Sequence, residues 1–124
     1  MKTKIRKQES EFKDEMIRTW RKEGRYTTIL CIESDETAPG FPDVFAYGEN
    51  GLTLYEFKSS KSVSDGTIKF KKTQPRFYLE HPELPIYIVA YDNRNGKVHI
   101  FPSWSLFDIG NYQISKSFTV RLPI

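Results

Sequence analysis

An Asn50-Gly51 step between two strand-forming runs constrains this chain more than any other feature of its sequence. The runs on either side, residues 43–47 and 52–58, are rich in β-branched and aromatic residues, which suit a pleated and half-buried surface. An Asn-Gly step between two such runs is a strong hairpin signal, because both residues accept the backbone conformations of a tight turn. The sequence therefore predicts that these two runs pair as antiparallel strands.

The spacing of apolar residues predicts the other elements. A long amphipathic helix is expected from residue 3 to residue 23, with Gly24 as its stop, and Gln74-Pro75 opens a second helix that runs to about residue 80. Residues 59–73 are rich in Ser and Lys without apolar periodicity, and we expect a mobile basic loop there. Further strands are expected at residues 26–32, 85–91, 97–101 and 118–122, and the apolar run 85–91 is typical of a central strand.

The order of these elements predicts an α/β fold. A helix is followed by a three-stranded meander, a second helix and further strands, which suggests a mixed central sheet flanked by the N-terminal helix and by a second helix after the hairpin. No internal repeat is visible, and 124 residues have room for one compact domain. We therefore expect residues 1–124 to form a single domain.

Composition and cysteine content limit the class of protein. With 38% hydrophobic and 28% charged residues, the chain has the composition of a globular protein, and no apolar run approaches the roughly 20 residues of a membrane span. The basic N-terminus leads into more charge, unlike a secretory signal. A single cysteine, Cys31, allows no internal disulfide and no cysteine metal cage, which favours a reducing cytoplasm.

The charges are distributed unevenly along the chain. Residues 1–25 carry nine Lys or Arg and five acidic residues, residues 26–57 carry six acidic and no basic residues, and residues 58–76 carry six basic residues and one acidic residue. If the acidic middle folds into a site between the basic segments, carboxylates can hold a divalent metal while the basic surface holds a polyanion. The alternative is a solvated surface with uneven charge.

Glu9 is the unusual carboxylate of the first helix. At about 100° per residue, the apolar stripe is centred close to the direction of Glu9, whereas Glu11 and Glu15 point away from it. A carboxylate on the buried side of a helix costs free energy unless it is paired or ligates a metal. At a helix end the side chain can also curl out to water, so both interpretations stay open.

The hairpin brings chemically useful groups together. Because side chains alternate along a strand, Glu56 and Lys58 point to the same face, and Pro42 places Asp43 at the start of the partner strand. Two carboxylates on adjacent strands can share a hard cation through oxygen ligands, and a neighbouring lysine can orient or help deprotonate an attacking water. An exposed Glu-Lys ion pair and a Pro-Asp turn are the alternatives.

Gly40-Phe-Pro42-Asp43, thirteen residues ahead of Glu56-Phe57-Lys58, resembles the active-site hairpin of the PD-(D/E)xK nuclease superfamily, which has the restriction-endonuclease-like fold. Gln74-x-x-x-Tyr78 is similar to a Gln-containing element of virus-type replication-repair nucleases and archaeal Holliday-junction resolvases. The resemblance covers roughly residues 5–101. It implies that Lys58 is the catalytic lysine and that Gln74 supports either Lys58 or the scissile phosphate.

The resemblance also implies complete sets of site residues. The implied catalytic residues are Asp43, Glu56, Lys58, Glu9 and Gln74. The implied ligands of Mg²⁺ or Mn²⁺ are Asp43, Glu56, the main-chain carbonyl of Phe57, and Glu9 as the outer carboxylate. Basic residues after the hairpin are expected to follow a phosphate backbone, unless they belong to a merely solvated loop. The residues expected to bind nucleic acid are Lys61, Lys69, Lys71, Lys72, Arg76 and Tyr78, although Tyr78 also suits packing of a helix on a sheet.

These features predict a metal-dependent DNA endonuclease. The chain is too short for a separate recognition domain, so we expect cleavage to depend on DNA structure, such as a branch or junction, or on a protein partner. The likeness to junction resolvases, which act as dimers, implies a homodimer, and a compact solitary nuclease is typical of phages and mobile elements. The alternatives are a catalytically inactive module of the same fold that binds nucleic acid or a protein partner, and an inhibitor or structural protein.

Overall fold

The computed structural model describes residues 7–32, 39–71, 73–106 and 117–121. Its elements are α1 (Glu9–Glu23), β1 (Thr28–Cys31), β2 (Val44–Gly48), β3 (Gly51–Ser60), the 3-10 helix η1 (Lys61–Asp65), β4 (Thr67–Lys71), α2 (Thr73–Glu80), β5 (Ile86–Asp92), β6 (Val98–Pro102), the 3-10 helix η2 (Ser103–Leu106) and β7 (Ser117–Arg121). A five-stranded sheet has the order β1-β2-β3-β5-β6, and β4 pairs with β7 in a two-stranded sheet. The protein is therefore mixed α/β, as predicted.

The predicted hairpin is confirmed. Strands β2 and β3 pair antiparallel, with Val44 opposite Tyr55 and Gly48 opposite Gly51 at the turn. Because Gly48 pairs with Gly51, the two loop residues are Glu49 and Asn50, and Gly51 follows them with a φ angle of +98°, a region that only glycine adopts readily. Strand β1 pairs antiparallel with the other side of β2 and completes the predicted meander.

Strand β5 lies inside the sheet, as its continuous apolar sequence predicts. It runs parallel to β3 and antiparallel to β6, which makes the sheet mixed. Val89 and Tyr91 are buried on one face of the sheet, while Ile88 and Ala90 are buried in a separate cluster on the other. Because both faces of β5 are buried, its sequence has little polar alternation.

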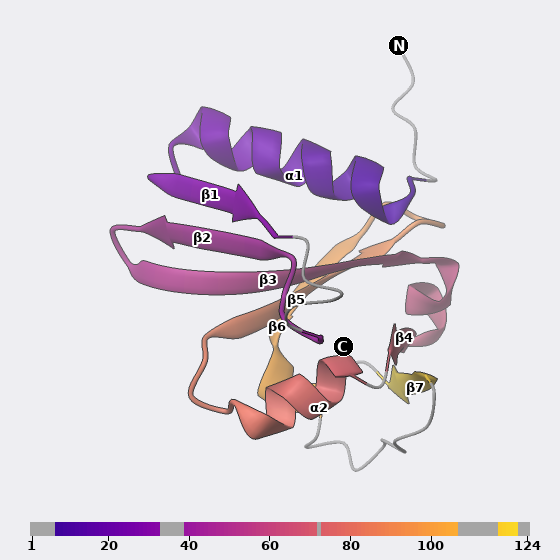
Figure 1. Ribbon diagram of the computed structural model, residues 1–124. Helices are drawn as coiled ribbons and strands as arrows, with labels where there is room; N and C mark the ends of the chain where they lie inside the picture. The colour runs from indigo at the N-terminus through magenta and orange to yellow at the C-terminus, as the bar shows by residue number, and fades with distance from the viewer. Residues whose placement is uncertain (1–6, 33–38, 72, 107–116, 122–124) are drawn as a thin grey trace.

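Helix α1 covers one face of the five-stranded sheet (Figure 1). Phe12 and Trp20 from the helix pack against Phe57 of β3, with ring centroids 5.8 Å apart in each case. The helix begins at Glu9, later than predicted, and residues 1–6 lie outside the described part of the chain. It ends where predicted, because Gly24 adopts a φ angle of +67° and caps the last turn.

The opposite face of the sheet is covered by α2, η1 and β4. Their buried residues Val63, Phe70 and Tyr78 join Leu54 and Ile88 of the sheet in one apolar cluster. Helix α2 lies on the side of the sheet away from α1 (Figure 1), and its observed span confirms the second predicted helix. The sheet is thus enclosed between two layers, and the even-numbered residues of β3 face the α2 layer.

The prediction of a mobile basic loop at residues 59–73 is wrong. In the described part of this stretch, β3 continues to Ser60 and is followed by η1 and β4. Ile68 and Phe70 are buried and alternate with the exposed Lys69 and Lys71, which is the two-residue period of a strand. This short alternation, together with pairing to the distant β7, makes the segment an ordered strand.

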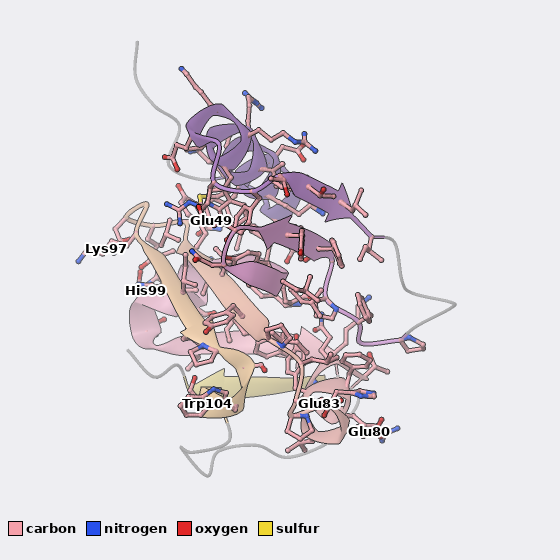
Figure 2. All side chains as sticks on the ribbon, turned by 90° about the vertical axis from the view of Figure 1, so that its left-hand side faces the viewer. Glu49, Glu80, Glu83, Lys97, His99 and Trp104 are labelled. Carbon is pink, nitrogen blue, oxygen red and sulfur yellow. The ribbon has the colours of Figure 1, made fainter. Side chains whose placement is uncertain are left out.

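Strand β6 ends the described five-stranded sheet. Lys97 and His99 lie toward one end of β6 and Trp104 near the other (Figure 2), and the Trp104 side chain is exposed. Within residues 7–32, 39–71, 73–106 and 117–121, no helix combines the length and the apolar character that a membrane crossing requires.

Candidate active site

Asp43 and Glu56 lie opposite each other on neighbouring strands. The register of β2 and β3 pairs Val44 with Tyr55, so the next position of the antiparallel ladder places Asp43 across from Glu56 on the same face. Two hydrogen bonds fix Asp43: its main-chain carbonyl accepts from the Ile32 N–H at 2.8 Å, and its Oδ1 accepts from the Phe57 N–H at 3.3 Å. The two carboxylates therefore face one region, as the candidate metal site requires.

Burial dominates the electrostatics of Glu56. The residue is only 4% exposed, and burial, with a further contribution from the negative charge of Asp43, raises the pKa of the Glu56 carboxyl to about 8. Lys58 acts in the opposite direction, with its Nζ 3.9 Å from Glu56 Oε2. The buried face of the hairpin thus holds a carboxyl group that ionises easily only when positive charge is close.

Lys58 is held in place by Gln74. The Lys58 Nζ donates to Gln74 Oε1 at 3.0 Å, and the same oxygen accepts from the main-chain N–H of Lys71 at 3.0 Å. The Lys58 ammonium also lies 5.2 Å from the centre of the Phe70 ring, within the range of a cation–π contact. Gln74 therefore joins β3, β4 and the start of α2 around Lys58, in agreement with the expected contact between Gln74 and Lys58.

Helix α1 adds two charged residues. Glu9 is the first residue of the helix and is exposed, which matches the water-facing alternative. Partial burial of its carboxyl and the charge of Asp43 nevertheless raise the pKa of Glu9, while Lys58 opposes them. Figure 1 shows the N-terminal end of α1 on the same side of the molecule as the C-terminal end of β3. Lys13, one turn after Glu9, places its Nζ 3.5 Å from Asp43 Oδ2.

Lys13 was not among the residues that the sequence singled out. Its spacing from Glu9, four residues along one helix, is a signal that could have found it, because such residues share a helix face. In the described part of the chain, no three or more His, Cys, Asp or Glu side chains form a group that could hold a metal. Asp43 and Glu56 form an opposed pair of carboxylates on neighbouring strands, and Glu9 as a further metal ligand stays a prediction.

A glycine connects the Asp43 segment to helix α2. Gly40 has a φ angle of +86°, and a Cβ atom added there would lie 2.1 Å from the carbonyl oxygen of Thr73. Phe41 packs edge-to-face on Phe77 of α2, with ring centroids 5.5 Å apart. The segment before Asp43 is thus held against the residue that precedes Gln74, so this close contact couples the two sides of the site.

The residues predicted to bind nucleic acid have different environments. Four of the basic residues predicted to bind nucleic acid are exposed, as a contact to phosphate requires: Lys61, Lys69, Lys71 and Arg76. Lys72 lies outside the described residues. The prediction that Tyr78 contacts nucleic acid is wrong for this structure, because the residue is 2% exposed and packs with Phe70 inside the apolar cluster. Its buried hydroxyl has no hydrogen-bond partner among the described residues.

The raised pKa of Glu56 predicts a pH-dependent stability. An unfolded Glu has a pKa of about 4.3, so folding favours the protonated form, and this stabilisation is present at acidic pH and lost as the pH rises through about 8. In EDTA, we expect the free energy of unfolding to fall by up to about 1.4 kcal/mol per pH unit across that window from this group. Urea unfolding between pH 5 and pH 8.5 measures it.

Glu56→Gln is the matched control, because it keeps the shape of the side chain and removes its titration. The variant should lose this part of the pH dependence. An unchanged slope in Glu56→Gln would show that Glu56 is already ionised throughout the window.

Comparison with known proteins adds no relative: the chain matches no protein-family model and no curated protein. Asp43, Glu56, Lys58 and Gln74 are brought together by β2, β3 and α2, and Lys13 and Glu9 approach them from α1.

Proposed function

We propose that this protein is a metal-dependent DNA endonuclease with a restriction-endonuclease-like fold and a PD-(D/E)xK active site. The observation that carries the proposal is the opposition of Asp43 and Glu56 on neighbouring strands, with the Lys58 ammonium 3.9 Å from Glu56. A buried carboxyl with a raised pKa beside a second carboxyl and a lysine is typical of a functional site rather than of a structural ion pair.

The donor set fits Mg²⁺ or Mn²⁺. Both ions prefer oxygen ligands, and Mg²⁺ sites commonly use one or two carboxylates together with water and phosphate oxygens. Asp43 and Glu56 would hold the ion, with the Phe57 carbonyl and Glu9 as further ligands. A cation there would also favour the ionised form of Glu56, which burial disfavours. When bound, the ion supplies a Lewis acid that activates water and neutralises charge on the phosphate.

Lys58 and Gln74 would act on the reacting phosphate. The Lys58 ammonium can donate hydrogen bonds to the phosphate and orient the attacking water, and it stabilises the negative charge that develops during phosphodiester hydrolysis. Gln74 keeps the ammonium in position through its 3.0 Å hydrogen bond. This hydrogen bond is made to a neutral amide, so it need not break when a cation binds Glu56, the carboxylate 3.9 Å from the Lys58 ammonium.

Substrate binding would use the exposed basic residues around this site. Lys61, Lys69, Lys71 and Arg76 can contact phosphates without reading base sequence, and Lys72 is proposed with them from the sequence. We therefore propose selection by DNA structure, at branches or junctions, or through a protein partner. A homodimer would supply two sites for two cuts. We also propose that the chain forms a single domain, that the protein acts in the cytoplasm and that it originates from a phage or mobile element.

A panel of labelled DNA substrates tests the function. Duplex, nicked, flap, single-stranded and four-way-junction DNA are incubated with wild type and with Glu56→Ala, each in Mg²⁺, Mn²⁺ or EDTA. We expect wild type to cut at least one substrate when either ion is present, and both Glu56→Ala and EDTA to abolish the products. Circular dichroism of Glu56→Ala checks that the variant is folded.

The same panel tests the second candidate function, an inactive module of this fold. Salt-dependent DNA binding without cleavage of any substrate in either ion would support the inactive module and contradict the nuclease. Absence of both cleavage and DNA binding would contradict both candidates and leave a protein-binding or structural role.

A further inference from the structure

Both oxygens of the Asp43 carboxylate are engaged, and they have different partners. Oδ1 accepts from the Phe57 main-chain N–H at 3.3 Å, a contact that belongs to the hairpin itself. Oδ2 faces the Lys13 ammonium at 3.5 Å. The side chains of Lys13 and Asp43 are 22% and 19% exposed, so the ion pair lies at the rim of the site, where solvent reaches it.

The two lysines of the site are held in different ways. Lys58 lies near Glu56, but its short hydrogen bond is to the neutral amide of Gln74. The hydrogen bond of Lys13 is made to Asp43, a proposed metal ligand. A divalent cation that reaches Asp43 therefore repels an ammonium bound to the same carboxylate. Lys58 can stay where it is, whereas Lys13 has to release Oδ2.

We infer that Lys13 is the counter-ion of Asp43 in the metal-free site, that a divalent cation displaces it, and that the released ammonium then contacts a phosphate of the DNA. This inference deepens the proposed nuclease function and rests on it. It assigns Lys13 a positioning and substrate-binding role, and it makes metal binding and DNA binding depend on each other.

The geometry permits this exchange. The ion pair is long and partly solvated, and such pairs contribute little stability, so its loss is easily offset. Lys13 stands on the rigid helix α1, one turn after Glu9, and its four-carbon side chain is flexible. The ammonium can therefore leave Asp43 and still remain at the mouth of the site, where the DNA backbone would pass.

The exchange predicts opposite effects on two affinities. Without DNA, Lys13 competes with the metal, so Lys13→Met should bind Mn²⁺ about fivefold more tightly than wild type, as expected for loss of a rim ion pair. With Ca²⁺ present to prevent turnover, Lys13→Met should bind DNA more weakly than wild type. The steepness of the plot of log affinity against log salt should decrease by about one, which corresponds to the loss of one phosphate contact.

Isothermal titration calorimetry with Mn²⁺ and fluorescence anisotropy with labelled DNA measure the two affinities. Lys22→Met is the matched control, because Lys22 is an exposed lysine in the last turn of the same helix. It should leave Mn²⁺ affinity unchanged. Lys13→Gln is a second variant that removes the charge and keeps a polar side chain, and it should behave like Lys13→Met.

The outcomes separate this inference from the proposed function. Unchanged or weaker Mn²⁺ binding by both Lys13 variants, while Asp43→Asn abolishes binding, would overturn the role of Lys13 and leave the metal site intact. Wild type that binds no Mn²⁺, or Asp43→Asn that binds it as wild type does, would overturn the metal site itself. Tighter Mn²⁺ binding with weaker DNA binding in both Lys13 variants supports the inference.

Discussion

Lys58→Ala should reduce the single-turnover rate of DNA cleavage by about 10³-fold, the scale expected when a charged group that stabilises a transition state is removed. The structure holds the Lys58 ammonium between Glu56 and Gln74, next to the carboxylates of the proposed metal site. DNA affinity should stay within about twofold of wild type, because the proposed interface has several other basic side chains that would contact the DNA backbone. Labelled DNA in Mn²⁺ measures the rate, and anisotropy in Ca²⁺ measures the affinity.

Lys61→Ala is the control for the loss of one positive charge. Lys61 is exposed on η1, directly after β3, so its removal should weaken DNA binding slightly and leave the rate at saturating DNA near that of wild type. Cleavage by Lys58→Ala at the wild-type rate in Mn²⁺ would remove Lys58 from the mechanism.

Gly40→Ala should destabilise the protein by about 4 kcal/mol, a loss that only a few mechanisms produce. Alanine is strained at a φ angle of +86°, and its Cβ would lie 2.1 Å from the Thr73 carbonyl oxygen and 2.7 Å from the Thr73 carbonyl carbon. Backbone atoms cannot move aside as a flexible side chain can. The segment that carries Asp43 and the start of α2 would therefore have to separate. Urea unfolding monitored by circular dichroism measures the loss.

Gly24→Ala distinguishes the steric contact from backbone strain. Gly24 also has a positive φ angle, +67°, but an added Cβ atom meets nothing within 4 Å among the described residues. The strain alone should cost about 1 to 2 kcal/mol. Equal destabilisation by the two substitutions would show that the Gly40 segment does not pack closely on α2.

Local chemistry explains the elements that were predicted from sequence. The Asn50-Gly51 turn, the alternation along β3 and the apolar run of β5 act over a few neighbouring residues, so they can be recognised without knowledge of the fold. The register does not follow from the Asn-Gly signal: a two-residue loop at residues 50 and 51 would pair residue 49 with residue 52, whereas the structure pairs Gly48 with Gly51 and so brings Asp43 opposite Glu56.

The remaining features depend on contacts between distant segments. Strand β4 was missed because its two buried residues, Ile68 and Phe70, lie in a lysine-rich segment, and its partner β7 is about 50 residues away in the chain. The sequence leaves two environments open for Tyr78, contact with nucleic acid and packing of a helix on a sheet, and packing against Phe70 and the sheet buries it.

The sequence by itself determined the hairpin and the shared face of Glu56 and Lys58, because side-chain alternation and turn chemistry are local properties. Only the tertiary structure decided that Gln74 holds Lys58, that Lys13 faces Asp43 and that Gly40 touches Thr73. These contacts join segments whose approach is set by how α1 and α2 pack on opposite faces of the sheet. Such packing depends on the shapes of many buried side chains at once, and no short stretch of sequence contains that information.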